Sequence, residues 1–202
     1  MVSAWFLSGC YFLLSVYRKV RLKDTVLFSL SLGFLIGTKT IALPYAAVLI
    51  LIFSLVLFKQ LRILSPRRIS FYFLLAAGLI IISGGYGYLR NFFQTGNPLY
   101  PLNVEFLGKT VFKGIFDKSA YTAHVDKSAY ALSKILFSEG LGGGLIVFVI
   151  PAFFVFVFNV FKKRITVEIF FVFLLPIILN LIWRYAIPLA NLRYLYPALA
   201  LG

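Results

Sequence analysis

The chain has 202 residues, of which 61% are hydrophobic and 13% are charged, and its mean hydropathy is +0.96. Soluble domains have about 45–50% apolar and about 25% charged residues, so the composition excludes an ordinary soluble domain and predicts membrane spans. The net charge of +14 comes from cations clustered between apolar runs, which is typical of cytoplasmic loops and argues against nucleic acid as a partner.

The first apolar run extends from Val2 to Tyr17, and four cations follow it between Arg18 and Lys23. Because Lys and Arg accumulate in cytoplasmic loops, this loop is predicted on the cytoplasmic side. The first span therefore enters the membrane from outside. The lone Cys10 lies in this run and is interpreted as a small packing residue.

The next apolar stretch, Thr25 to Phe58, would be about 51 Å long as one helix, against a hydrocarbon core of about 30 Å. A second basic cluster, Lys59 to Arg68, follows it and is also predicted in the cytoplasm. Two cytoplasmic loops require an even number of crossings, so the stretch is predicted to be a hairpin of two short helices. The predicted break lies at Thr38-Lys39-Thr40, between Gly37 and Pro44.

A further span is predicted outward over Ile69–Leu89, followed by a polar extracytoplasmic loop over Arg90–Gly140. The chain then returns inward over Leu141–Phe161 and outward over Thr166–Tyr185, around the basic cluster at 162–164. The predicted fold class is all-α: a polytopic transmembrane helix bundle with one short-helix hairpin, forming a single domain over residues 1–202. Apolar sequence at both ends predicts that the chain is part of a longer protein.

Within the outer loop, residues 129–137 have apolar side chains at i, i+3 and i+4 after an Asp126-Lys127-Ser128 cap. This pattern is typical of a short amphipathic helix at the membrane surface, and an ordinary loop turn is an equal alternative. His124 has no cysteine or second histidine partner, so no metal site is predicted in this chain.

The most informative motif is Arg90-Asn91 followed by Thr95-Gly96-Asn97-Pro98-Leu99-Tyr100-Pro101. Gly96 and Asn97 tolerate positive φ, and Pro98 forces an extended residue before it, so a turn is predicted. Snorkelling of Arg90 at the membrane boundary is one interpretation. It does not explain an arginine on the outer side, where the charge bias disfavours it.

This motif resembles the segment after a mid-chain helix in the bacterial GT-C membrane glycosyltransferases, relatives of the protein mannosyltransferases and lipid A aminoarabinose transferases. Gly33 to Thr40 is similar to the Gly-x-x-x-Gly-x-x-Lys stretch of that family's short-helix pair. Leu192 to Pro197 is similar to its Arg-Tyr-x-x-Pro. In order, the three motifs cover most of the chain.

The resemblance implies a multi-pass protein of the bacterial inner membrane that transfers a sugar from a polyprenyl-phosphate donor to a cell-envelope acceptor on the extracytoplasmic side. The family's catalytic carboxylate lies in a first outer loop that has no counterpart before Val2, so no catalytic residue is assigned. No cofactor is evident, and the resemblance leaves room for a divalent metal in a longer protein. The alternatives are an O-antigen polymerase or ligase, a lipid-linked-sugar flippase, and a non-catalytic membrane subunit.

The residues predicted to bind the lipid phosphate are Lys39, Arg90, Asn91, Arg193 and Tyr194. The resemblance sets Lys39 near the phosphate, where an ammonium is a point charge for an anion, and snorkelling to headgroups is an equal alternative. Arginine's planar fork suits bidentate phosphate binding. Arg184 is interpreted as an interfacial anchor instead, and membrane lipids are the other predicted partner.

Overall fold

The computed structural model describes residues 1–60, 65–106 and 109–115, together with residues 154, 157–158 and 178. By its internal contacts the chain divides into two compact units, Met1–Lys118 and Ser119–Gly202, and the elements below belong to the first. The predicted amphipathic helix at 129–137 and the spans at 141–161 and 166–185 lie outside the described residues. The single domain over residues 1–202 stays a prediction.

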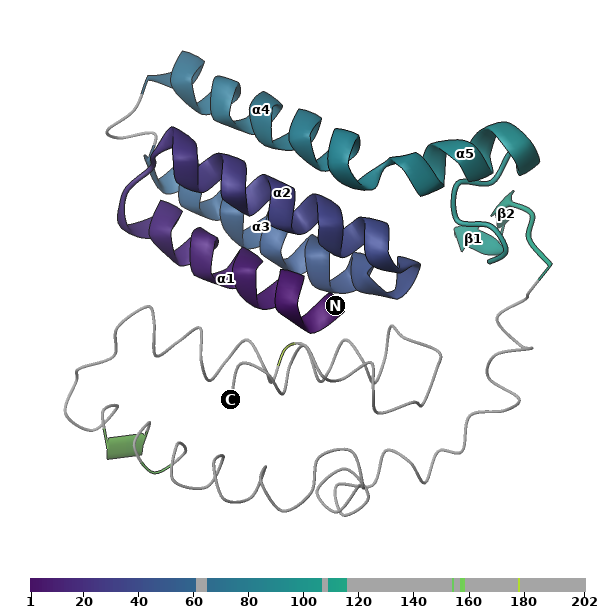
Figure 1. Cartoon of the computed structure of the whole chain (residues 1–202), viewed down its shortest axis with the longest axis horizontal. Coiled ribbons are helices and arrows are strands. Elements are labelled where there is room, and N and C mark those ends of the chain that lie inside the picture. The colour runs from purple at the N-terminus through teal and green to yellow at the C-terminus, as the bar shows by residue number, and fades with distance from the viewer. Residues whose placement is uncertain (61–64, 107–108, 116–153, 155–156, 159–177, 179–202) are drawn as a thin grey trace. The chain divides into compact units, whose positions relative to one another are not determined.

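Four long helices run alternately in opposite directions along one bundle (Figure 1). They are α1 (Val2–Arg18), α2 (Leu22–Thr38), α3 (Leu43–Lys59) and α4 (Pro66–Gly84), with the 3-10 turn η1 (Thr40–Ala42) before α3. Helix α2 packs against α1 and α4, and α3 packs against α1. The described part of the chain is therefore mostly helical, as the fold class predicted.

The predicted break between two short helices is confirmed at Lys39. Its backbone is extended, with φ −160° and ψ 142°, so α2 ends at Thr38 and the chain reverses through η1. Pro44 lies in the first turn of α3. A backbone N–H at this position would have no partner within the helix, so proline loses no helical hydrogen bond there. Each arm has 17 residues, or about 25 Å of helix, somewhat less than the roughly 30 Å hydrocarbon core.

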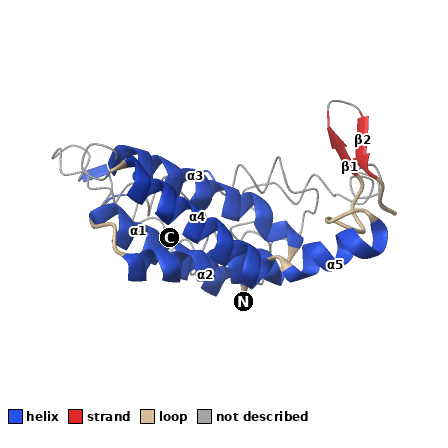
Figure 2. Ribbon diagram, turned by 90° about the horizontal axis from the view of Figure 1, so that it is seen from above, coloured by secondary structure: helices blue, strands red, loops and turns tan. Residues whose placement is uncertain are grey.

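The predicted end of the span at Leu89 and the loop predicted after it need correction. Helix α4 ends at Gly84, five residues earlier than predicted, and a further helix, α5 (Tyr86–Thr95), follows after Gly85. Residues 90–95 are thus helical rather than the start of a loop. An antiparallel pair of short strands, β1 (Val104–Phe106) and β2 (Lys109–Phe112), then departs from the all-α prediction. Figure 2 shows α5 and both strands at the same end of the bundle.

The core of the bundle consists of large, fully buried side chains from α1, α2 and α3. They include Phe6, Leu13, Phe28, Leu32, Leu35, Tyr45, Leu49 and Leu57. The rings of Phe28 and Phe53 stack with centroids 4.7 Å apart and join α2 to α3. Helices α2 and α4 also pack through a close approach of their backbones, because Gly33 and Gly37 of α2 face Ser83 and Gly84 of α4.

Hydroxyl groups inside the helices donate to their own backbone. Thr25, Ser29 and Ser31 of α2 are buried, and their side chains donate to the carbonyl oxygens four residues earlier at 3.1, 2.7 and 2.8 Å. Ser54 of α3 and Ser83 of α4 do the same. Such bonds satisfy a hydroxyl that has neither water nor another side chain as partner.

Much of the outer surface of the bundle is apolar. Leu51, Leu55 and Phe58 form one exposed stripe on α3, and Leu74 and Ile82 of α4 are 74% and 80% exposed. By length and composition α4 is the one helix in the described ranges that can cross a membrane, and α3 is apolar but shorter. Only 17% of the apolar window of α4 is buried, so this helix is not the enclosed core of the bundle.

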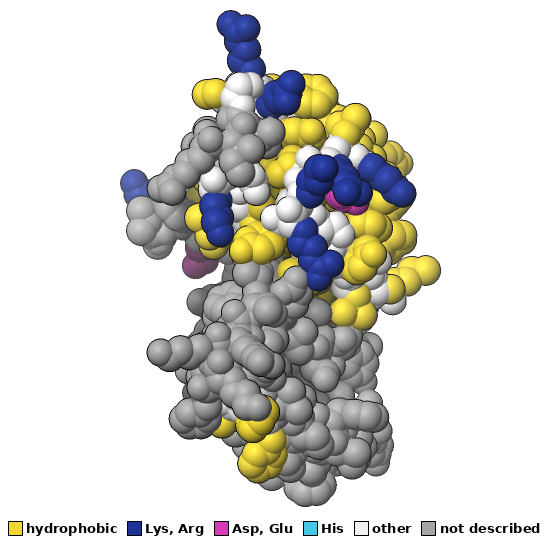
Figure 3. Space-filling model, turned by 90° about the vertical axis from the view of Figure 1, so that its left-hand side faces the viewer, with side chains coloured by type: hydrophobic (Ala, Val, Ile, Leu, Met, Phe, Trp, Pro, Cys, Tyr) yellow, Lys and Arg dark blue, Asp and Glu magenta, His cyan; other side chains and the backbone are white. Residues whose placement is uncertain are grey.

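One end of the bundle gathers the basic residues (Figure 3). The end of α1, the start of α2, the end of α3 and the start of α4 meet there, and their exposed cations are Arg18, Lys19, Arg21, Lys23, Lys59, Arg67 and Arg68. The Lys59 ammonium lies 5.2 Å from the centroid of the Tyr17 ring, which ties α3 to α1. Both N-terminal basic clusters thus lie at the same end, as the hairpin prediction requires.

Candidate functional site

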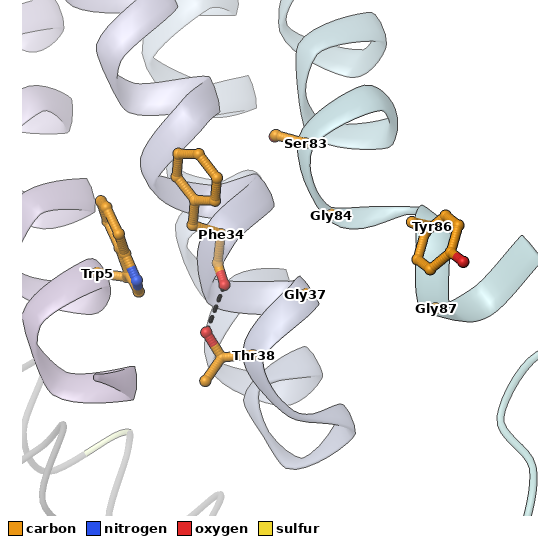
Figure 4. Close-up of a pocket in the computed structure, with 8 residues that line it drawn as sticks. All are labelled: Trp5, Phe34, Gly37, Thr38, Ser83, Gly84, Tyr86 and Gly87. Atoms are coloured by element: carbon orange, nitrogen blue, oxygen red, sulfur yellow. Dashed lines mark hydrogen bonds between the residues drawn. The ribbon is translucent and has the colours of Figure 1, made fainter.

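The opposite end of the bundle contains a pocket with a volume of ≈ 350 Å³ (Figure 4). Four helices line it: Trp5 comes from α1, Phe34, Gly37 and Thr38 from α2, Ser83 and Gly84 from α4, and Tyr86 and Gly87 from α5. The volume is at the lower end of the range for small-molecule sites, about 300–1,000 Å³. The pocket thus suits a group of the size of a single ring.

The glycines explain why the helices meet closely beside the pocket. A Cβ atom on Gly84 would lie 2.9 Å from the carbonyl carbon and 3.1 Å from the Cα of Gly33, which is closer than side chains pack. A Cβ on Gly37 would lie 3.2 Å from the Gly84 Cα. By contrast, a Cβ on Gly87 would meet nothing within 4 Å, so its missing side chain leaves open space.

Aromatic rings form one wall of the pocket. Trp5 and Phe34 lie with ring centroids 4.7 Å apart and their planes inclined by 33°. Figure 4 shows both rings on the same side of the pocket, across from Ser83 and Tyr86. The pocket therefore offers ring faces to a ligand on that side.

A few polar atoms accompany these rings. The Thr38 hydroxyl donates to the Phe34 carbonyl at 2.6 Å, and the Ser83 hydroxyl donates to the Leu79 carbonyl at 2.6 Å. Each hydroxyl oxygen still has lone pairs that can accept a hydrogen bond from a ligand. The Trp5 indole N–H adds a donor. The pocket thus combines apolar faces with a small number of hydrogen-bonding groups.

Lys39 and Arg90, both predicted site residues, stand beside the pocket rather than in its lining. Lys39 directly follows the lining residue Thr38, and its side chain is exposed. Arg90 follows Tyr86 by four residues and Gly87 by three along α5, so the three lie on one helix face. Two exposed cations are therefore close in sequence to lining residues, Lys39 next to Thr38 and Arg90 one helical turn after Tyr86.

Asn91, the third predicted site residue in the described range, has a structural partner. Its side-chain amide donates to the Tyr100 carbonyl at 3.2 Å and so links α5 to the turn that follows. Arg193 and Tyr194, the remaining two, lie outside the described residues. The convergence of Lys39, Arg90 and Arg193 on one cavity therefore stays a prediction.

The Thr-Gly-Asn-Pro turn is organised by Asn97, a residue that sequence reasoning assigned only to a turn. Asn97 is buried, and its side-chain amide donates to the carbonyls of Leu102 at 2.8 Å and Lys113 at 3.1 Å. The side-chain oxygen Oδ1 of Asn97 accepts from the Leu99 backbone N–H at 2.9 Å. Gly96, with φ 71°, ends α5 in the left-handed region that favours glycine. The motif thus joins α5 to the strand pair.

Tyr88 links α5 to the end of α2. Its hydroxyl donates to the Ile36 carbonyl at 2.9 Å. Ile36 lies in the last turn of α2, where carbonyls have no partner within the helix, so Tyr88 supplies the missing donor. Burial also raises the pKa of the Tyr88 hydroxyl. Sequence reasoning missed this contact, because nothing local in either segment indicates it.

Carboxylates are sparse in the described part of the chain. Asp24 lies in the first turn of α2 at the basic end, and Glu105 of β1 accepts a hydrogen bond from the Asn103 amide at 3.2 Å. Over the described ranges, no three His, Cys, Asp or Glu side chains group as metal ligands.

Comparison of the chain with protein-family models, with curated proteins and with solved structures gave no match.

Proposed function

We propose that the chain is part of a multi-pass glycosyltransferase of the bacterial inner membrane. It transfers a sugar from a polyprenyl-phosphate-linked donor to a cell-envelope acceptor on the extracytoplasmic side. One observation carries the proposal: Lys39 directly follows a residue that lines a pocket of ≈ 350 Å³, Arg90 lies one helical turn after another, and the pocket is at the end of the bundle opposite the basic clusters.

Both the surface and the interior of the bundle support its location in a membrane. The exposed faces of α3 and α4 are rich in leucine, isoleucine and phenylalanine, which lipid chains cover and water does not. Inside the bundle, the hydroxyls of Ser29 and Ser83 bond to their own helix, as an apolar interior requires. Cations concentrated at one end then orient that end toward the cytoplasm.

The chemical part rests on the two cations at the other end. A polyprenyl-phosphate sugar carries its phosphate at the membrane surface, with an apolar chain below it and a sugar beside it. An exposed lysine and an exposed arginine beside a small pocket fit such a ligand, since Arg90 offers a bidentate fork and Lys39 a point charge. The pocket then provides the space for the sugar.

Lys39 has a matched control in Lys19. Each lysine directly follows a helix, is exposed and has an extended backbone, with φ −160° for Lys39 and −156° for Lys19. We expect Lys39→Ala to weaken the binding of a polyprenyl-phosphate sugar by about ten-fold or more, because a charge-assisted hydrogen bond contributes roughly 1.5–3 kcal/mol. Lys19→Ala, at the basic end, should change the affinity less than two-fold. Binding is measured on the full chain in nanodiscs.

Arginine is tested by a substitution that keeps the charge. We expect Arg90→Lys to weaken donor binding comparably to Lys39→Ala, because an ammonium cannot reproduce the bidentate fork. The control is Arg68→Lys, an exposed residue at the basic end. If Arg90→Lys binds the donor as the parent does, Arg90 is an anchor and the phosphate site is refuted. Donor binding without transfer in the full-length protein would favour a flippase or a non-catalytic subunit.

A further inference from the structure

We infer that the pocket between α1, α2, α4 and α5 holds the sugar ring of the donor lipid. This inference rests on the proposed function and adds the position of the sugar within the site. The lining combines the rings of Trp5 and Phe34 with Tyr86 and small residues from α4 and α5.

The composition of the lining fits a sugar better than a hydrocarbon chain. One face of a pyranose ring presents C–H groups, which pack on an aromatic face, while the hydroxyls around its edge need hydrogen-bond partners. Trp5 supplies an aromatic face and an N–H donor. Thr38 and Ser83 place hydroxyl oxygens in the same pocket, each with acceptor capacity left. A prenyl chain would form no hydrogen bond with these groups, whereas a sugar hydroxyl can donate to the two oxygens and accept from the Trp5 N–H.

The position of the pocket relative to the two cations agrees with a sugar phosphate. In such a donor the phosphate is bonded directly to the ring, so the cations that bind it must stand at the rim of the ring's pocket. Lys39 adjoins Thr38 in the lining, and Arg90 lies one helical turn beyond Tyr86. The lining itself contains no Lys or Arg. Charge at the rim and a neutral interior match the two parts of the ligand.

Gly87 permits a test that fills the pocket without disturbing the fold. It lines the pocket, and a Cβ placed on it would meet nothing within 4 Å. Gly78 of α4 has the same open surroundings and does not line the pocket, so it serves as the control. Leucine is a better helix former than glycine, so Gly87→Leu and Gly78→Leu should both fold as well as the parent.

Two ligands are compared on the full chain in nanodiscs: a polyprenyl-phosphate sugar and the same polyprenyl phosphate without the sugar. We expect Gly87→Leu to weaken binding of the sugar-bearing lipid by about ten-fold or more and to leave the sugar-free lipid within about two-fold. Gly78→Leu should change neither. Equal weakening of both lipids, or no weakening of either, would overturn the assignment of the pocket to the sugar.

Trp5 provides a second readout that does not depend on the leucine variants. The chain has two tryptophans, so Trp183→Phe leaves Trp5 as the only one. We expect the sugar-bearing lipid to change Trp5 fluorescence and the sugar-free lipid to leave it unchanged. If the parent binds the sugar-bearing lipid while Trp5 does not respond, the pocket assignment fails and the proposed function stands. If the parent binds neither lipid, the proposed function itself fails.

Discussion

The two ends of the α1–α4 bundle differ in how they carry charge. At the basic end, seven exposed cations among the described residues lie around the α1–α2 connection and the facing ends of α3 and α4, and Asp24 is the only carboxylate of these four helices. At the pocket end, Lys39 and Arg90 are single cations separated by aromatic and small residues. Lys109 and Lys113 add charge only on the strand pair beyond α5 and just after it.

The difference separates cations whose position membrane orientation explains from cations whose position it does not explain. Dense, solvated cations next to apolar helices are explained by membrane orientation alone and need no ligand. Cations at the opposite end are not explained by this charge bias, which disfavours them on that side. At the pocket end, Tyr88 joins α5 to α2 and Asn97 fixes the turn after α5.

The largest expected effect comes from separating α2 and α4 at the pocket end. Gly84→Ala puts a methyl group against the Gly33 backbone, which cannot rotate away as a side chain would. We expect the variant to lose about 1–3 kcal/mol of stability, the usual cost of overpacking. Thermal unfolding in detergent measures this loss.

Gly78→Ala is the control for that variant, because it adds the same methyl group to the same helix where nothing lies within 4 Å. It should unfold at the parent's temperature or slightly above, since alanine favours the helix. Equal unfolding temperatures for Gly84→Ala and Gly78→Ala would show that α2 and α4 do not meet closely at this end.

An effect of similar size but more local is expected from Asn97→Ala. The substitution leaves the carbonyls of Leu102 and Lys113 without their donor, and a buried group left unpaired costs about 1–3 kcal/mol. We expect faster hydrogen exchange at the Leu99 and Ile115 amides and unchanged exchange at the Lys19 amide of the basic end. Gln94→Ala, at an exposed position of α5, should change none of them. Uniform loss of protection at both ends would contradict a local role.

The sequence allowed the helical hairpin to be predicted because its signals are local. Glycine, threonine and proline around Lys39 weaken a helix that was already too long for one crossing. The two basic clusters were predicted at the same end of the bundle because this signal is local too, and the structure has them at one end. The end of α4 was misplaced because apolar residues continue past Gly84, and hydropathy alone does not register a break between two glycines.

The organisation of the pocket end could not be predicted because its contacts are long-range. Tyr88 and Ile36 are 52 residues apart, and neither has a pattern that pairs them. The strands β1 and β2 are three and four residues long, and the amide of Asn97 anchors the chain next to them through Leu102 and Lys113. A buried asparagine that satisfies two backbone carbonyls reads in sequence as an ordinary turn residue.

The central claim, that the two ends lie on opposite sides of a membrane, is tested most directly by cysteine labelling. In a Cys10→Ala background, Ser65→Cys reports the basic end and Gln94→Cys reports α5, and both positions are exposed. We predict that a membrane-impermeant thiol reagent labels Gln94→Cys in intact spheroplasts and labels Ser65→Cys only after the membrane is permeabilised. Labelling of Ser65→Cys in intact spheroplasts, alone or together with Gln94→Cys, would contradict the account.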